Sequence, residues 1–191
     1  MTDSIAQPII DREALLIELV DETGHAVGAC PVAEAHQAPG RLHRAFSVLL
    51  FDTAGRVLLQ QRAAAKTRFP SLWANTCCGH PAPGEPVAAA AARRLSEELG
   101  LTAVLTEAGI YRYRAEDLRT KRVEFEWDHV LIGQLDVGTP RPDPDEVADY
   151  AWVQLDALRD ALASDPDAYT PWLAGVLDVA DHARGTGMSL R

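Results

Sequence analysis

Two adjacent cysteines and a histidine stand near the middle of this chain, in the stretch NTCCGHPAPGEP (75–86). Glycine and proline surround them and an alanine-rich segment follows, so the pattern predicts a turn just before a helix. A thiol can exchange a proton or act as a nucleophile, and an imidazole can bind a metal. The stretch is therefore a candidate chemical site.

A second candidate feature is the pair of acids in RVEFEWDHVLIGQL (122–135). The segment is rich in β-branched and aromatic residues, which favours a long strand. Alternation along a strand places Glu124 and Glu126 on the same face. Neighbouring carboxylates repel each other unless a cation or solvent compensates them, so the pair predicts either a metal site or a solvated sheet face.

Histidines upstream could complete such a metal site. His36 and His43 flank a Pro-Gly turn in HQAPGRLH. Taken singly, each is more often a surface or core imidazole than a ligand. Together with His80 and the two glutamates they offer three nitrogens and two carboxylates, a set that suits Zn²⁺, Mn²⁺ or a similar ion. Spacing alone does not show that they converge.

The elements that must position these residues follow from periodicity and turn signals. Apolar runs joined by a short glycine-containing turn predict a β-hairpin over 45–63. Proline at the start and Gly100 at the end bound a helix over 86–99. Other patterns predict strands over 14–21, 25–32, 102–115 and 149–154, a long loop over 64–84, a polar connector over 139–146 and helices over 156–164 and 170–183. We expect one α/β domain with a mixed sheet.

Composition narrows the class of protein. The 191 residues are 47% hydrophobic and 24% charged, which is typical of one globular domain. The net charge of -10 argues against nucleic acid or a membrane surface as a partner, since both favour a basic face. Only three cysteines occur and the N-terminus does not resemble a signal peptide, so we expect a cytoplasmic protein. We expect a monomer or weak dimer.

The helix over 86–99 carries a further pattern. The spacing from Gly79 through Glu85 and Arg93 to RLSEELGL resembles the Nudix box. In Nudix hydrolases the glutamates of that helix bind the Mg²⁺ that activates water. Here Arg94 stands where the box has its first glutamate, which weakens the hydrolytic interpretation. The alternative is an ordinary helix face with i,i+4 arginine–glutamate pairs.

Several motifs in order carry a closer resemblance. HQAPGRLHRAFSVLLFD, SLWANTCCGHPAPGE, RRLSEELG and VEFE resemble type I isopentenyl-diphosphate isomerases, over about residues 14–178. The resemblance implies a Nudix-like α/β/α sandwich over 14–180, between tails 1–13 and 181–191. It also implies that a small prenyl diphosphate is isomerised, between isopentenyl and dimethylallyl diphosphate, by protonation and deprotonation through a tertiary carbocation.

The same resemblance assigns roles to individual residues. It makes Cys78 the catalytic thiol and Glu126 its partner, with Cys77 left to packing. Glu98 would hold a Mg²⁺ together with the diphosphate. The residues implied to hold a second ion, Mn²⁺, Zn²⁺ or Mg²⁺, are His36, His43, His80, Glu124 and Glu126. The substrate residues are Arg62, Lys66 and Arg94 on the diphosphate, with Tyr113, counted among the catalytic residues, and Trp172 lining the hydrocarbon pocket.

One departure bears on the substrate. The family has a basic residue shortly before the first histidine, where PVAEAH offers Val32 instead. We expect Arg119, Lys121 or Arg122, in the charged loop AEDLRTKR, to supply the missing charge. Three alternatives stay open: a Nudix pyrophosphohydrolase, an isomerase paralogue acting on or binding a related prenyl diphosphate, and a non-catalytic domain that kept the pocket.

Overall fold

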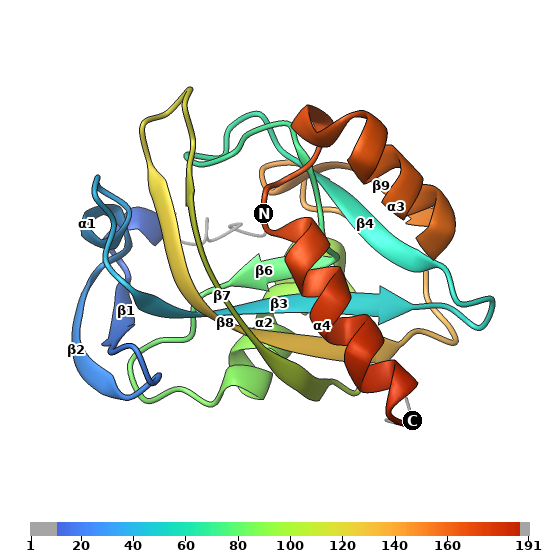
Figure 1. Cartoon of the computed structure of the whole chain (residues 1–191), viewed down its shortest axis with the longest axis horizontal. Helices are drawn as coiled ribbons and strands as arrows, with labels where there is room; N and C mark the ends of the chain where they lie inside the picture. Colours follow the sequence, from blue (N-terminus) through green and yellow to red (C-terminus); the bar gives the residue numbers. More distant parts are fainter. Residues whose placement is uncertain (1–10, 188–191) are drawn as a thin grey trace, which may run out of the picture.

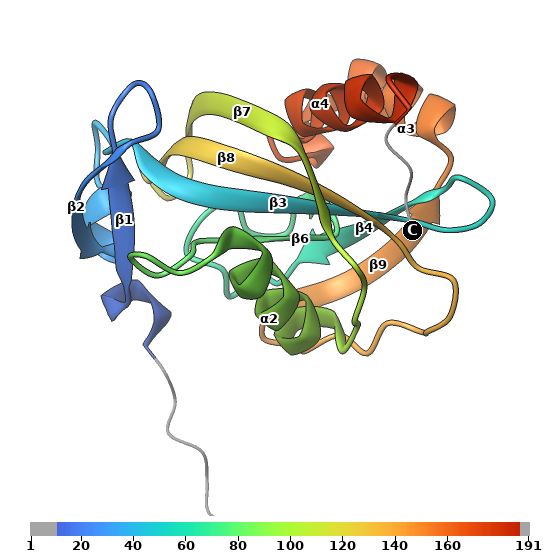
Figure 2. The same cartoon turned by 90° about the horizontal axis from the view of Figure 1, so that it is seen from below.

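A mixed β-sheet forms the centre of the computed structural model, which describes residues 11–187 (Figure 1). Helix α2 covers one face of the sheet, and α3 and α4 cover the other (Figure 2). The described residues form nine strands: β1 (Leu16–Val20), β2 (Ala26–Pro31), β3 (His43–Phe51), β4 (Val57–Arg62), β5 (Trp73–Ala74), β6 (Cys77–Gly79), β7 (Thr106–Glu116), β8 (Val123–Gln134) and β9 (Val147–Val153). The helices are η1 (Arg12–Ala14), α1 (Val32–Ala35), α2 (Val87–Leu99), α3 (Leu155–Ser164), η2 (Pro166–Ala168) and α4 (Leu173–Gly185).

Strand β3 organises the sheet. It runs parallel to β8 over its whole length, and antiparallel to β6, with β1 and β4 pairing at its two ends. Strands β7 and β9 extend the sheet beyond β8 and β4. Because β6 and β8 both pair with β3, segments far apart in the sequence bring their side chains to one region.

Both faces of β3 are buried, which explains its nearly continuous apolar sequence. Val48 and Leu50 pack with α2 on one face. Leu49 and Phe51 pack with α3 and α4 on the other. The expected α/β/α sandwich is therefore confirmed.

Helix α2 confirms the helix predicted over 86–99. Pro86 precedes it, and Gly100 ends it in the left-handed conformation, with φ of 62° and its N–H donating to the carbonyl of Ser96. Leu95 and Leu99 are fully buried against the sheet. Arg94 is buried on the same side of the helix, whereas Arg93 lies on its exposed side.

One prediction of local structure was wrong. The expected loop over 64–84 contains β5 and β6, so Cys78 lies on a strand rather than in a turn. The strand expected over 25–32 is confirmed as β2, and the short helix α1, which was not predicted, follows it from Val32. Strands β5 and β6 exist through their pairing with β4 and β3, which local patterns do not reveal.

The ends of the structure bear on two other expectations. Helix α4 continues to Gly185, and η1 begins at Arg12, so ordered structure extends on both sides of residues 14–180. The rest of the expected tails, 1–10 and 188–191, lies outside the described residues. Between residues 11 and 187, no helix has both the length and the apolar character needed to cross a membrane.

Candidate active site

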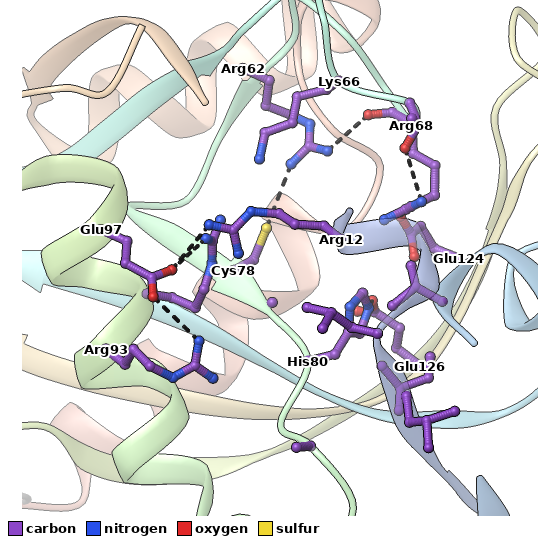
Figure 3. Close-up of a pocket in the computed structure, with 18 of the residues that line it drawn as sticks. Arg12, Arg62, Lys66, Arg68, Cys78, His80, Arg93, Glu97, Glu124 and Glu126 are labelled. Carbon is purple, nitrogen blue, oxygen red and sulfur yellow. Dashed lines mark hydrogen bonds and ion pairs between the residues drawn. The ribbon is translucent and has the colours of Figure 1, made fainter. Parts of the chain in front are cut away.

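A cavity of about 640 Å³ brings most of the predicted site residues together (Figure 3). Cationic side chains from several elements line part of it, and Glu124 and Glu126 line another part. The predicted residues on its wall are Arg62, Lys66, Cys78, His80, Arg94, Tyr113, Glu124, Glu126 and Trp172. The cavity therefore combines a thiol, carboxylates, cations and aromatic rings.

Three imidazoles meet beside this cavity. The ring centroids of His36, His43 and His80 lie 4.6, 4.9 and 5.1 Å apart, each pair edge to face. His36 and His43 are fully buried, whereas His80 borders the cavity. The predicted convergence of the three histidines is thus seen directly.

Backbone carbonyls fix the orientation of the two buried rings. Nδ1 of His36 donates to the carbonyl of Val32, and Nδ1 of His43 donates to that of Arg41, both at 2.7 Å. Since a carbonyl can only accept, each Nδ1 carries a proton, so in the neutral ring Nε2 has a lone pair that can bind a metal. Metal-binding histidines are typically held in this way by an outer partner.

The carboxylates of β8 close the cluster. Nε2 of His36 lies 2.7 Å from Oε2 of Glu124, and Nε2 of His80 lies 3.1 Å from Oε1 of Glu126. Burial, and for Glu126 also the charge of Glu124, works to raise the pKa of these glutamates, but His36 and Arg68 beside Glu124 and His43 and His80 beside Glu126 outweigh this and lower the pKa of both. Nε2 of His43 lies 3.7 Å from Oε1 of Glu126.

This donor set fits a divalent metal ion. One ligand atom from each of the five residues lies within 4.8 Å of all the others. Three of these buried atoms, Nε2 of His36, Nε2 of His43 and Oε2 of Glu124, have no hydrogen-bond partner in the described chain. The short contact between His36 and Glu124 lacks hydrogen-bond geometry, so both atoms are left unpaired. Such buried, unpaired acceptors are costly unless a cation binds between them.

We expect His80→Ala to reduce the metal content of the purified protein, because it removes one nitrogen ligand. Metal per chain, measured by mass spectrometry of the dissolved protein, is the readout. His129→Ala is the matched control, since His129 pairs with Glu107 elsewhere on the sheet. Equal metal content in both variants would contradict the assignment of the site.

Strand β6 separates the two adjacent cysteines. Cys77 lies opposite Val48 and is fully buried in the core beneath α2. Cys78 lies opposite Ser47 and faces the cavity, with Nη1 of Arg62 at 3.6 Å from its sulfur. Burial raises the pKa of Cys78 to about 12, so the thiol is protonated at neutral pH. Alternation along β6 therefore leaves a single cysteine on the cavity wall.

Aromatic side chains adjoin the glutamate. The hydroxyl of Tyr113 donates to Oε2 of Glu126 at 2.7 Å. Trp172 lies 5.8 Å from the Tyr113 ring, and its Nε1 donates to Asn75. Arg62 lies 5.7 Å from the centre of the indole. The indole is thus held in place beside both the cavity and a cation.

Opposite the histidine cluster, acids bind the basic residues tightly. Arg94 contacts Glu97, Glu98 and Glu146, and Lys66 also contacts Glu146. Burial works against ionisation of Glu146, but Lys66 and Arg94 outweigh it and lower the pKa to about 2. These shared carboxylates fix the cations at the cavity wall.

Glu98 is placed differently from the other predicted residues. It is 1% exposed and does not line the cavity. One of its oxygens pairs with Arg94, and the other accepts from Gln60 at 3.0 Å. Both oxygens are therefore occupied, and the expected Mg²⁺ contact stays a prediction.

Some residues of the site were missed, and one expectation was wrong. Arg119, Lys121 and Arg122 do not line the cavity, and Arg122 instead donates to the carbonyl of Ala33 in α1. The cavity gains cations instead from Arg12 and Arg68. Arg68 stands close to Lys66 in the sequence, a signal that could have found it. For Arg12 and Glu146 no local pattern gives such a signal.

Known proteins resemble this chain in both sequence and fold. The model of the NUDIX domain matches residues 41–173. A protein of Nocardia farcinica, named isopentenyl-diphosphate Delta-isomerase, is 73% identical over 87% of this chain and 95% of its own length. A protein of that name from Streptomyces griseus is 50% identical over 88% of this chain and 84% of its own length.

Solved structures extend the likeness of fold. A crystal structure of a Deinococcus radiodurans protein matches with a TM-score of 0.66 at 19% identity, over 89% of this chain and 98% of its own. A Nudix hydrolase of M. smegmatis matches with a TM-score of 0.58 at 21% identity, over 82% and 97%. At these identities the likeness concerns the fold alone.

Proposed function

Because the chain belongs to the isopentenyl-diphosphate Delta-isomerases, a family of NUDIX-domain proteins, it interconverts isopentenyl and dimethylallyl diphosphate, and we propose here how its cavity does so. The reaction moves an unactivated double bond. A proton must reach the terminal alkene carbon, and another must leave the carbon beside the one that bears the diphosphate. The chemistry therefore requires two proton-exchanging groups around one substrate.

One observation carries the assignment of those groups: a thiol and a carboxylate face the same cavity from different strands. Cys78 lies opposite Ser47 of β3, and Glu126 lies opposite His43 of the same strand. These register positions are four residues apart, or about 13 Å along the strand. That spacing leaves room for a five-carbon chain between the two side chains.

In this proposal, Cys78 and Glu126 divide the proton transfers between them. One group donates its proton to the alkene, which gives a tertiary carbocation, and the other removes a proton to form the new double bond. The reverse reaction exchanges their roles. Each turnover leaves the donor without its proton and the acceptor with an extra one, so both must exchange protons before the same direction repeats.

The remaining wall residues bind and shield the substrate. Arg62, Lys66 and Arg94 contact the diphosphate oxygens, for which planar guanidinium groups are well suited. Trp172 offers its π face to the cation, an interaction worth roughly 2 kcal/mol or more when water is excluded. Tyr113 donates to Glu126 and thereby orients the carboxylate toward the substrate.

We assign the divalent ion, Mg²⁺, Mn²⁺ or Zn²⁺, to the cluster of His36, His43, His80, Glu124 and Glu126. When bound, such an ion would keep the glutamates charged and offset their mutual repulsion. Both oxygens of Glu98 already pair with Arg94 and Gln60, so the Mg²⁺ expected there has no role in these steps.

Two wider properties complete the proposal. We infer that the protein acts as a monomer or a weak dimer. A cytoplasmic location fits the three free cysteines, which suit a reducing compartment.

Incubation with isopentenyl diphosphate and Mg²⁺ tests the function. We expect dimethylallyl diphosphate to appear, seen by proton NMR, without release of inorganic phosphate. Arg94 supports this expectation over hydrolysis, because it neutralises Glu97 and Glu98 on the helix where hydrolases hold their metal. Phosphate release without isomerisation would instead identify a pyrophosphohydrolase.

A further inference from the structure

A short segment before the first strand lies against the cavity. We define residues 11–14 as the N-terminal strap; its helical turn η1 is capped by the side chain of Asp11, which accepts from the amide of Glu13 at 3.0 Å. Arg12 lines the main cavity and also a neighbouring cavity of about 200 Å³. Lys66 and Arg68 likewise line both. The strap therefore helps to form the wall between the two cavities.

Consecutive side chains of the strap attach it to two sides of the site. Arg12 lies 3.1 Å from Glu97 on α2 and 2.9 Å from Glu146. Glu13 accepts from Arg68 at 2.7 Å, and Arg68 also donates to Glu124 of the histidine cluster. The strap is thus held on one side beside the basic residues Arg94 and Lys66, and on the other side beside the histidine cluster.

Arg12 joins the basic residues that are already assigned to the diphosphate. Arg12 and Arg94 contact the same oxygen, Oε2, of Glu97. They also share Oε1 of Glu146, whose other oxygen contacts Lys66. Three cations therefore converge on one carboxylate, next to the cavity, and Figure 3 shows Arg12 reaching to Glu97.

The guanidinium of Arg12 keeps capacity to bind an anion. Its ion pairs use Nε and Nη2, and Nη1 carries further N–H donors. The side chain is 44% exposed, so these donors are accessible from the cavity. The two carboxylates hold the group in place before the substrate arrives, which lowers the cost of ordering it on binding.

We propose that Arg12 is a substrate-binding residue, which reaches the diphosphate from the N-terminal strap alongside Arg94 and Lys66. This inference rests on the proposed function for the identity of the substrate. The anion-binding part can be tested separately with inorganic pyrophosphate. The strap is then part of the active site rather than a tail that precedes it.

Calorimetric titration of inorganic pyrophosphate in the presence of Mg²⁺ tests the inference directly. We expect Arg12→Ala to weaken binding about tenfold, as loss of a charge-assisted hydrogen bond does, and Arg12→Lys to recover part of the affinity. With isopentenyl diphosphate, Arg12→Ala should raise KM by a similar factor while kcat stays within a few-fold.

Two further variants separate this role from others. Arg56→Ala is the matched control, because Arg56 is also 44% exposed and also pairs with an acid, but in the β3–β4 turn. Glu13→Gln loosens the strap while keeping its cation, and should weaken binding less than Arg12→Ala.

Three results would overturn the inference: Arg12→Ala binding pyrophosphate as Arg56→Ala does, Glu13→Gln losing as much affinity as Arg12→Ala, or wild-type protein not binding pyrophosphate. If wild-type protein binds pyrophosphate through Arg12 but does not isomerise isopentenyl diphosphate, the proposed function fails and the anion site stands.

Discussion

Replacing Cys78 by alanine is expected to reduce isomerase turnover by about a thousandfold or more, because it removes one of the two proton-exchanging groups. The sulfur faces the cavity and its thiol is protonated at neutral pH, whereas alanine has no proton to exchange in its place. Steady-state rates with isopentenyl diphosphate, together with the thermal midpoint of each protein, give the measurement.

Cys77→Ala is the control that the structure provides for this variant. It removes the same group one residue away, but from the core beneath α2. We expect its turnover to stay within a few-fold of wild type, although its stability falls. If the two variants lose activity equally, or if Cys77→Ala is the more affected, Cys78 is not the reactive thiol.

Replacing Glu126 by glutamine should nearly eliminate turnover while leaving diphosphate binding largely intact. The amide keeps the shape of the side chain but loses the charge and basicity needed to exchange a proton. Tyr113 still has an oxygen to which it can donate, so the local structure should persist. Raising the metal concentration should not restore the rate.

Glu124→Gln is the paired comparison, because Glu124 stands two residues earlier on the same face of β8. Its proposed role is only to bind the metal, beside His36 and Arg68. Excess Mn²⁺ should therefore partly restore its rate, since mass action compensates for a weakened ligand but not for a missing proton carrier. The measurement is the turnover rate of both variants as a function of metal concentration. If added metal restores Glu126→Gln but not Glu124→Gln, Glu124 is the residue that transfers the proton and Glu126 only binds the metal.

Local patterns in the sequence were sufficient for much of the fold. The hairpin over 45–63 and the helix ending at Gly100 each depend on residues close together in the chain, and both were predicted. The alternation in VEFE likewise predicted that both glutamates share one face of the strand, and in the structure both lie beside the three histidines. Strand β6 was missed because it is only three residues long and exists through its pairing with β3.

The positions of the basic residues that line the cavity were less predictable, for a similar reason. Arg12 and Glu97 are 85 positions apart, and Lys66 and Glu146 are 80 apart. Charge alone suggested Arg122 as a substitute cation, but its side chain is used to bind a backbone carbonyl. Side chains of this kind can only be assigned once the fold shows which charges converge.

The central claim, that two separate groups of this chain transfer the two protons, is tested most directly by a single turnover of isopentenyl diphosphate in D₂O. Because Cys78 and Glu126 both exchange with solvent, the account predicts dimethylallyl diphosphate with deuterium in the new methyl group, while the proton removed from the carbon beside the diphosphate-bearing one is lost to solvent. Dimethylallyl diphosphate that retains the original proton in its methyl group would show that one group carries it across, and would contradict the account.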